Sequence, residues 1–462
     1  MSQGTSLTSK IGRINNWRNG TILQRQAANR RVTVVVLDGG GIGVMPKHPL
    51  IDSGSSSIPN AAFMFHNEFG NFALPNLERL GLGNIATIAG VPAAEKPAGS
   101  YGVLTLDPNV MTDTITGHWA LMGLETGQYP VNLNGFSNTF IKWLELKTGV
   151  TFIGGGKNIS GTTILEECGA EAKNGRPILY TSSDSVLQVA YHVGFKGVDL
   201  DGWRTDLAEG FSVYERDVLA MYSLCAEIRQ HLNESADPKH KFLRVIARPF
   251  VTDDTKKGQF TRISALRKDW ALQVPGKSVL DQAKKAGFST IGIGKICDIF
   301  SGQGLTETHP ALTPPFPKHL KDDMEGIDFL IDVLKEPDSG ITFVNLVDLD
   351  EKYGHRNDWE GYAKALMTID SRLPEIQSAM GPNDILIFTG DHGNDPTRGL
   401  TSLYVQNGLD RSFFTERGTN HTREYVPFLA FGDPIRGGVN IGVHGMKDVA
   451  DLIRSYLGLE RK

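Results

Sequence analysis

Cysteine is scarce in this chain, and its few cysteines are far apart. The 462 residues include three, Cys168, Cys225 and Cys297, and no two of them form a CxxC pair. This spacing argues against a disulfide framework and against a structural zinc site. A reducing compartment is the simplest interpretation, so we expect a cytoplasmic protein.

Long apolar runs and an excess of positive charge are also missing. No run of 18 or more apolar residues occurs, so the sequence predicts no membrane-spanning helix. The net charge of -5 provides no basic footprint for nucleic acid and no polybasic patch for a membrane surface. We therefore expect neither partner, and the sequence does not indicate an oligomeric state.

Acidic residues are absent from the first 37 residues, which contain six basic ones. An organelle transit peptide has this composition, poor in acids and rich in arginine. A polar extension without a targeting role is the alternative, and no apolar core of a secretory signal follows. We assign residues 1–31 to an N-terminal extension and leave its role open.

Three uninterrupted apolar runs predict strands that are buried on both faces, as in a parallel sheet. VTVVVL is followed by Asp38, ITFVNLV by Asp348 and Asp350, and DILIFTG by Asp391 and His392. Helical patterns such as DWEGYAKALMTIDSRLPEIQSAM separate strands of this kind, which predicts an α/β fold with helices on both faces of the sheet. Ligands of such sheets lie beyond the carboxyl ends of the strands.

The middle of the chain is more polar and mixed, as in GRPILYTSSDSVLQVAYHV and KFLRVIARPFVTDD. Since the acid-ended strands before and after it must serve one site, we predict a second α+β domain inserted into the first. Apolar residues make up 40% of the chain, enough for two sizeable cores. The predicted core domain comprises residues 32–131 and 274–462, and the inserted domain comprises residues 132–273.

Six side chains near these strand ends are suitable metal ligands. Mixed oxygen and nitrogen donors suit Mn²⁺, Zn²⁺ or Mg²⁺, and histidine favours the first two. Six ligands exceed the need of one ion, so a two-metal site is the natural division, and two metals can serve phosphoryl transfer. Each residue alone has an ordinary alternative, such as a helix cap or a loop histidine. The six are Asp38, Asp350, His355, Asp391, His392 and His421.

The local backbone decides whether these side chains converge. Adjacent residues of a strand point to opposite sides, so Asp391 and His392 need a turn to face one site. We expect the flanking Gly390 and Gly393 to allow it. Asp348 lies two residues before a candidate ligand, so we expect it on the same face, one step deeper, in a structural role.

The stretch TDTITGHW, residues 112–119, offers three threonine hydroxyls. A threonine hydroxyl is a poor nucleophile until a metal stabilises its alkoxide. With metal ligands predicted nearby, we favour one of the three as a nucleophile. A turn whose hydroxyls bond the backbone is the alternative.

The chain resembles the phosphopentomutases of the alkaline phosphatase superfamily. The resemblance rests on LDGGGIG, LPNLERLGLGNI, DTITGHW, RVIARPF, IGIGKICDIFSGQGLTE, VDLDEKYGHRND, TGDHGNDPT and GTNHTREYVPFLAFG, which occur in the family's order from about residue 32 to 433. It implies an alkaline-phosphatase-like α/β core, with a mainly parallel sheet flanked by helices and an inserted α+β cap domain.

The family's site residues carry over by motif. The phosphorylated threonine lies four residues before the histidine of TGHW, so the resemblance implies Thr114, whose oxygen or phosphate also contacts the metals. We expect His118, next to this chemistry, to be structural. The resemblance implies two Mn²⁺ ions, one held by Asp38, Asp391 and His392 and the other by Asp350, His355 and His421.

Substrate-binding positions of the family match Asp184 in YTSSDS, Arg248 in IARPF and Arg267 in LRKDW. Arginine suits phosphate because its planar fork binds two oxygens. At Arg267, surface ion pairing is the alternative. The implied reaction is the interconversion of (deoxy)ribose 1-phosphate and (deoxy)ribose 5-phosphate through a phosphothreonine and a bisphosphate. A bisphosphorylated sugar such as glucose 1,6-bisphosphate would be the activator, and cap closure would exclude water.

Four features depart from the family pattern. Gly39 replaces a serine, Ala120 an acidic residue and Asn420 an aspartate, and residues 44–73 replace a TLGHI-like block. By motif position they lie near the mouth of the site, so altered sugar specificity is one alternative. A metal-dependent sugar-phosphate phosphatase and a non-catalytic sugar-phosphate-binding protein are the others, and salvage and a specialised biosynthetic branch both remain open.

Overall fold

The computed structural model describes residues 29–43, 55–182, 184–194, 213–253, 259–311, 319–398 and 420–459. Most of the predicted N-terminal extension, and residues 44–54 of the diverged segment, lie outside this part. The chain divides into two compact units: unit 1 comprises residues 1–127, 274–310 and 320–462, and unit 2 comprises residues 128–273 and 311–319. Among the described residues, no helix is both long and apolar enough to cross a membrane.

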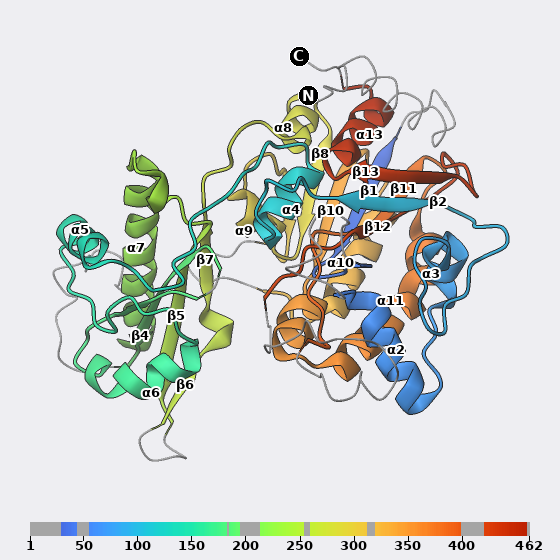
Figure 1. Cartoon of the computed structure of the whole chain (residues 1–462). Coiled ribbons are helices and arrows are strands. Elements are labelled where there is room, and N and C mark those ends of the chain that lie inside the picture. Colours follow the sequence, from blue (N-terminus) through green and yellow to red (C-terminus); the bar gives the residue numbers. More distant parts are fainter. Residues whose placement is uncertain are drawn as a thin grey trace, which may run out of the picture. The chain divides into compact units, whose positions relative to one another are not determined.

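Unit 1 contains an eight-stranded sheet in the order β13-β2-β12-β11-β1-β10-β8-β9 (Figure 1). Neighbouring strands are parallel except at β12, which is antiparallel to both β11 and β2. The mainly parallel sheet is therefore confirmed. The strands are β1 (Arg31–Leu37), β2 (Ser100–Thr105), β8 (Ser289–Ile293), β9 (Glu307–His309), β10 (Gly340–Leu346), β11 (Asp384–Gly390), β12 (Val426–Phe431) and β13 (Asn440–Gly445).

The three acid-ended strands lie together at the centre of the sheet. β1 pairs in parallel with β10 on one side and with β11 on the other, and Leu37 lies opposite both Leu346 and Gly390. Every residue of the three strands is buried, as expected for runs that are apolar on both faces. Because the strands end at the same level, the chain segments that follow them start side by side.

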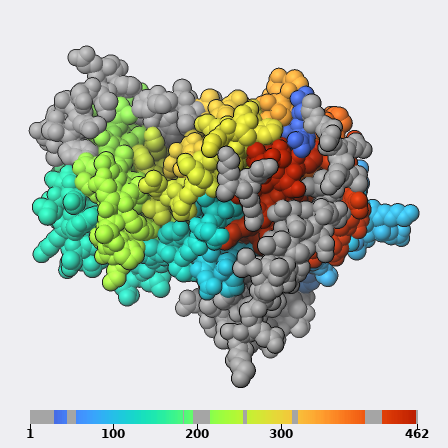
Figure 2. All heavy atoms as spheres, turned by 90° about the horizontal axis from the view of Figure 1, so that it is seen from above, coloured from blue at the N-terminus to red at the C-terminus, as the bar shows by residue number. Residues whose placement is uncertain are grey.

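Helices cover both faces of this sheet. On one face, α2, α3, α10 and α11 share an apolar core with strand residues such as Val35, Val344 and Leu386. On the other, α4, α8, α9 and α13 pack together, and Figure 2 shows α13 (red) at the surface beside α8 (yellow). The helices are α2 (Ser57–Phe69), α3 (Pro75–Leu80), α4 (Thr114–Leu121), α8 (Val279–Lys285), α9 (Ile296–Phe300), α10 (Asp323–Lys335), α11 (Trp359–Ala379) and α13 (Lys447–Leu457).

Unit 2 is built on a smaller sheet in the order β3-β4-β5-β6, with β7 paired to β5. Only the β4–β5 pair is parallel among the described pairs of this sheet. Its elements are α5 (Asn138–Thr148), α6 (Gly161–Ala172), β3 (Ile178–Tyr180), β4 (Val186–His192), α7 (Val213–Glu234), β5 (Arg244–Thr252), β6 (Phe260–Arg262) and β7 (Lys268–Ala271).

The chain after β10 does not continue as a strand. Residues Leu349–Tyr353 form a π-helical turn, and Gly354–Arg356 follow as a 3₁₀ turn. The prediction that Asp348 shares a strand face with Asp350 is therefore wrong, because the alternation of side chains applies only to extended backbone. The carboxylate of Asp348 instead pairs with Lys352 at 2.9 Å, one helical turn further on.

Asp348 also lies against a second buried carboxylate, that of Asp323 at the start of α10. Asp323 N–H donates to Asp348 Oδ2 at 3.2 Å, and Asp323 Oδ1 accepts the N–H groups of Val347 and Asp348 at 2.7 and 3.1 Å. Within the described part of the chain, Oδ2 of Asp323 is buried without a hydrogen-bond partner. Burial, followed by the charge of Asp348, raises the pKa of Asp323 to about 7.

We predict that Asp323→Asn stabilises the protein at pH 8 and has little effect near pH 4. The folded-state pKa is raised above the ordinary 3.8, so the stability that protonated Asp323 contributes is lost as pH rises from about 4 to about 7. Asparagine keeps one oxygen for the two N–H groups and carries no charge. Urea titration should show a gain of ~1–3 kcal/mol in the free energy of unfolding at pH 8.

Asp332→Asn is the matched control, because Asp332 lies on the same helix with an exposed carboxylate paired to Lys335. It should leave the pH dependence of stability unchanged. If wild type and Asp323→Asn lose stability in parallel between pH 5 and pH 8, Asp323 is not the group responsible.

Candidate active site

Three of the predicted ligands form one buried group. Ligand atoms of Asp38, Asp391 and His392 all lie within 4.8 Å of one another. His392 Nε2 is 3.5 Å from Asp38 Oδ1 and 3.4 Å from Asp391 Oδ2. Oδ1 of Asp391 accepts the N–H groups of Gly39 and His392, and its Oδ2 faces the imidazoles of His392 and His118. Two buried carboxylates and an imidazole with ligand atoms this close together fit a divalent cation.

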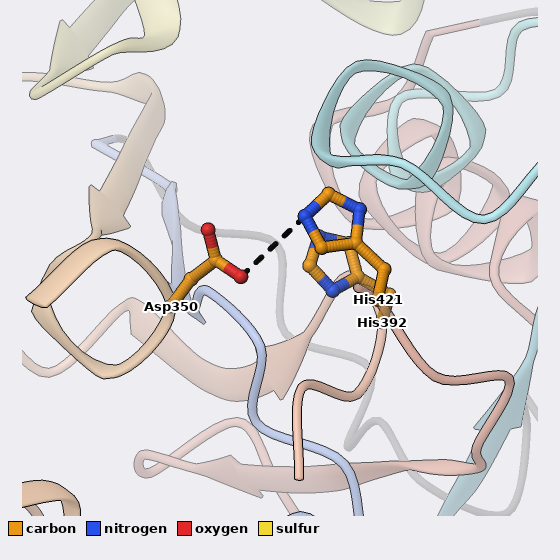
Figure 3. Close-up of side chains that lie close together, drawn as sticks. All are labelled: Asp350, His392 and His421. Atoms are coloured by element: carbon orange, nitrogen blue, oxygen red, sulfur yellow. Dashed lines mark ion pairs between the residues drawn. The ribbon is translucent and has the colours of Figure 1, made fainter. Parts of the chain in front are cut away.

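A second group shares one histidine with the first. Asp350, His392 and His421 also offer ligand atoms within 4.8 Å of one another, as Figure 3 shows. His421 Nε2 is 3.5 Å from Asp350 Oδ1, and the rings of His392 and His421 are stacked with centroids 3.9 Å apart. His355 also lies against Asp350, with Nε2 3.1 Å from Asp350 Oδ2. All six predicted ligands therefore converge, and His392 stands between the two groups.

Each ligand carboxylate also lies against a side chain that the sequence did not single out as a ligand. Asn345 Nδ2 donates to Asp38 Oδ2 at 2.9 Å, and Asn394 Nδ2 donates to Asp350 Oδ1 at 2.7 Å. His118 Nδ1 lies 3.2 Å from Asp391 Oδ2 and hydrogen-bonds the carbonyl oxygen of Thr114 at 2.8 Å. Sequence reasoning missed both asparagines, although an amide inside the apolar run ITFVNLV was a signal for Asn345. Amide donors orient a carboxylate without adding positive charge.

Burial and neighbouring charges shift the pKa values of the three ligand carboxylates in different directions. Burial, then the charges of Asp391 and Asp350, hold the pKa of Asp38 well above its usual range. Burial alone would raise the pKa of Asp350, but His355 and His421 together outweigh it and hold that pKa well below the usual range. At Asp391, burial is likewise outweighed, by His392 and His118, and the pKa is lowered. Three buried carboxylates this close together favour a cationic partner.

Thr114 is the hydroxyl that faces these ligands. It is the first residue of α4, where the Asp113 carboxylate caps the helix by accepting the N–H of Ile115 at 2.9 Å. Thr114 Oγ1 lies 3.2 Å from His392 Nε2 and 3.4 Å from Asp38 Oδ1. The hydroxyl of Thr116 is instead engaged with the carbonyl oxygens of Met111 and Asp113.

Glycines act here mainly by leaving space. As expected, the chain bends at Asp391 and His392 after β11 and both side chains face one site, although neither Gly390 nor Gly393 adopts a left-handed conformation. A Cβ at Gly393 would lie 2.3 Å from Glu424 Oε1, and one at Gly117 would lie 2.5 Å from the Asp391 carbonyl oxygen. The missing side chains let α4 and Glu424 approach the ligand-bearing segment closely.

The three predicted substrate-binding residues lie in unit 2. Arg267 forms a two-pronged ion pair with Asp269, with Nε–Oδ1 at 2.8 Å and Nη2–Oδ2 at 2.7 Å. Arg248 Nε donates to Gln188 Oε1 at 3.1 Å, and burial and the charge of Arg267 lower its pKa to about 10. Asp184 lies in the turn before β4, where Ser182 Oγ is 3.5 Å from its Oδ2. The two arginines therefore affect each other electrostatically, and the ion pairing considered for Arg267 is present.

Comparison with known proteins shows which family this chain resembles. The profile of the metalloenzyme superfamily matches residues 30–461. A phosphopentomutase of Symbiobacterium thermophilum is 38% identical over 437 residues, covering 94% of this chain and 96% of that protein. One of Alkaliphilus metalliredigens is 40% identical over 435 residues, covering 93% and 96%. Among solved structures, the PH0037 protein from Pyrococcus horikoshii covers 94% of this chain and 99% of its own, with a TM-score of 0.42 and 13% identity.

The mainly parallel sheet with carboxylates and imidazoles beyond its strand ends, together with the profile match, defines a metalloenzyme with an alkaline-phosphatase-like α/β core. Within this superfamily the chain belongs to the phosphopentomutase family. The expected fold class and the expected enzyme class, an isomerase of the intramolecular phosphotransferase type, are thereby confirmed.

We predict that His392→Gln weakens metal binding in both groups, because the His392 imidazole belongs to both. Isothermal titration of chelator-treated protein with Mn²⁺ should show wild type binding two ions per chain. In the variant we expect at least an ~10–100-fold loss of affinity, the range seen when residues that merely orient ligands are changed.

His444→Gln provides the control, because His444 lies on β13, the edge strand, and pairs there with Asp448. It should bind Mn²⁺ as wild type does. Two ions of undiminished affinity in His392→Gln would contradict a shared position for this imidazole.

Proposed function

We propose that this chain interconverts (deoxy)ribose 1-phosphate and (deoxy)ribose 5-phosphate through a phosphorylated Thr114 and a sugar bisphosphate. The observation that carries the proposal is the place of the Thr114 hydroxyl, within 3.4 Å of both Asp38 and His392. The phosphopentomutases that share 38–40% of its sequence over nearly the whole chain support the pentose phosphate as substrate.

Two divalent ions, for which Mn²⁺ suits the donor set, are part of this proposal. We infer that the two groups described above hold them, with His355 completing the ligands around Asp350 and with Thr114 at the junction. When bound, such ions neutralise charge on the transferring phosphoryl group and on the departing alkoxide. The donor set of three carboxylates and three imidazoles fits Mn²⁺ better than Mg²⁺, since magnesium prefers oxygen ligands.

The chain itself prepares Thr114 for phosphorylation. Thr114 opens α4, so a phosphate on its oxygen lies at the positive end of the helix dipole and near free backbone N–H groups. The Asp113 cap fixes the first turn, and His118 fixes the Thr114 carbonyl from one turn further on. Both contacts fix the backbone that carries the hydroxyl group.

Unit 2 would bind the sugar phosphate, and we propose residues 132–273 as the cap domain. Arg248, Arg262 and Arg267 all lie close enough to Tyr180 to act on its phenol electrostatically. Of these three guanidinium groups, Arg267 forms an ion pair with Asp269. The charge of the same carboxylate also affects the pKa of Arg248. The excess positive charge suits a phosphate dianion. We propose Asp184, which matches a substrate-binding position of the family, as a further residue that binds the substrate.

In the proposed reaction, Thr114 gives one phosphoryl group to the sugar and receives another from it. Phosphorylated Thr114 donates its phosphoryl group to the free hydroxyl of the pentose monophosphate. The bisphosphate reorients and returns its other phosphoryl group to Thr114, so the product carries phosphate at the other end. A bisphosphorylated sugar such as glucose 1,6-bisphosphate would load Thr114 initially.

A cytoplasmic location agrees with the three free cysteines.

We predict that the Mn²⁺-loaded protein, given ribose 5-phosphate and a bisphosphate primer, forms ribose 1-phosphate in excess over free phosphate. Thr114→Ala should lower this activity by at least ~10³-fold, because the step has no other nucleophile. Intact-mass measurement should show one phosphate per primed wild-type chain and none on Thr114→Ala. Free phosphate as the main product would favour a phosphatase.

Thr112→Ala is the control for the site of modification, because it removes a neighbouring hydroxyl from the same stretch. It should still take up one phosphate. If Thr114→Ala is phosphorylated instead, the nucleophile is another residue.

We predict that Arg248→Lys raises KM for ribose 5-phosphate about tenfold, since losing a charge-assisted hydrogen bond costs ~1.5–3 kcal/mol. Lysine keeps the charge but not the planar fork. Initial rates across a ribose 5-phosphate series measure the effect. Arg372→Lys is the control, because Arg372 lies on α11 and pairs with Asp328 of α10 and Glu375 of α11. It should have the wild-type KM. Equal KM in all three proteins would remove Arg248 from the substrate site.

A further inference from the structure

We propose that Glu424 is a positioning residue that holds the segments carrying both groups of metal ligands in fixed relation, without contacting either ion. The proposal rests on the proposed metal sites. Glu424 lies three residues after His421 and is only 2% exposed. It belongs to neither group of metal ligands in the described part of the chain.

The Glu424 carboxylate is the meeting point of three chain segments. Oε2 accepts the N–H groups of Gly43 and Ser57 at 3.1 and 2.9 Å. Oε1 accepts the hydroxyls of Ser57 and Thr422 at 2.7 and 2.6 Å. These donors come from the loop after β1, the start of α2 and the segment before β12. Four donors on one buried carboxylate fix its place.

Two glycines bring further segments into contact with the same carboxylate. A Cβ at Gly41 would lie 2.2 Å from Glu424 Oε2, and a Cβ at Gly393 would lie 2.3 Å from Glu424 Oε1. The carboxylate cannot move aside easily, because its four hydrogen bonds hold it. Gly41 is three residues after Asp38, and Gly393 directly follows His392. Any side chain at these two positions would push a ligand-bearing segment away.

Through these contacts Glu424 reaches the backbone beside three ligands: Asp38, His392 and His421. A fourth is reached through Ser57, whose hydroxyl donates to Glu424 and accepts the N–H of Asn394 at 2.9 Å. Asn394 in turn donates its amide to Asp350 at 2.7 Å. Both ligand groups are therefore tied to one carboxylate, and a two-metal site depends on the distance between its halves.

A purely structural role is the alternative, in which Glu424 only anchors the start of α2. Asp395 does the same from another side, because its Oδ2 accepts the Ser56 N–H and the Asn60 amide at 3.1 and 2.6 Å. The two roles make different predictions. Weakening an anchor lowers the melting temperature alone, whereas releasing a positioning residue changes metal affinity in the folded protein.

The test compares Glu424→Gln with Asn60→Ala, which removes one anchor of α2 and leaves Glu424 intact. Glutamine has the same shape, but its NH₂ group cannot accept the hydrogen bonds now made to one of the two oxygens. Metal-free proteins are titrated with Mn²⁺ while electron paramagnetic resonance follows the free ion and the spin coupling of the bound pair. We expect Glu424→Gln to bind both ions ~10–100-fold more weakly, with altered coupling.

In the mutase assay, Glu424→Gln should lose kcat at saturating Mn²⁺ with an unchanged KM for ribose 5-phosphate. Asn60→Ala should lower the melting temperature and leave Mn²⁺ affinity unchanged. Equal Mn²⁺ affinity and coupling in Glu424→Gln and wild type would overturn the proposal. Failure of the wild type itself to bind two ions would instead refute the proposed metal sites.

Thr422→Val serves if Glu424→Gln does not fold. It removes one donor to Glu424 Oε1 from the residue after His421 and preserves the side-chain shape. We expect weaker binding of the Mn²⁺ ion that His421 would hold, and unchanged affinity for both ions would overturn the proposal.

Discussion

The site depends on one constraint, the parallel pairing of β1 with both β10 and β11 without any stagger. Leu37 lies level with Leu346 and Gly390, so the segments that carry Asp38, Asp350 and Asp391 all leave the sheet at one level. A one-residue slip of such a strand would turn every side chain to the opposite face and disrupt its packing against the helices on both sides. The positions of the carboxylates are therefore determined by the packing of the apolar strands.

Burying several carboxylates close together costs free energy, and the pKa shifts of the three ligand carboxylates show where the charge is compensated. Imidazoles outweigh burial at Asp350 and Asp391, whose pKa values are lowered. At Asp38, whose Oδ1 lies 3.5 Å from the shared His392, burial and the charges of Asp391 and Asp350 prevail, and its pKa is raised. Its hydrogen bond from Asn345 offsets part of that cost without charge. A site that leaves one carboxylate poorly compensated binds cations more strongly than one whose charges are balanced.

Much of this was predictable from the sequence, because the strong signals were local. Apolar runs that end in acidic residues predicted the three strands, and the spacing within TDTITGHW together with the family resemblance selected Thr114, which lies against His392 and Asp38. Predictions that assumed continued strand geometry were wrong, since nothing in VDLDEKY announces a π-helical turn after β10. The contacts of Glu424 with Gly43 and Ser57 span more than 360 residues, so no local pattern could indicate them.

Within the described residues, the departures from the family pattern do not place a new side chain against Thr114. Gly39 has φ +76°, where a serine would be strained, and its Cβ would lie 3.2 Å from Asn394 and 3.3 Å from Asp350. Ala120 is 1% exposed within α4, so the change there concerns packing and not the mouth of the site, contrary to expectation.

Asn420 is exposed, and its carbonyl oxygen accepts a hydrogen bond from Arg398. Residues 55–73 of the diverged segment supply Ser57, which supports Glu424. Gly39, Ala120 and Ser57 thus lie in the scaffold around the ligands, so a change in sugar preference would have to arise from residues that contact the sugar.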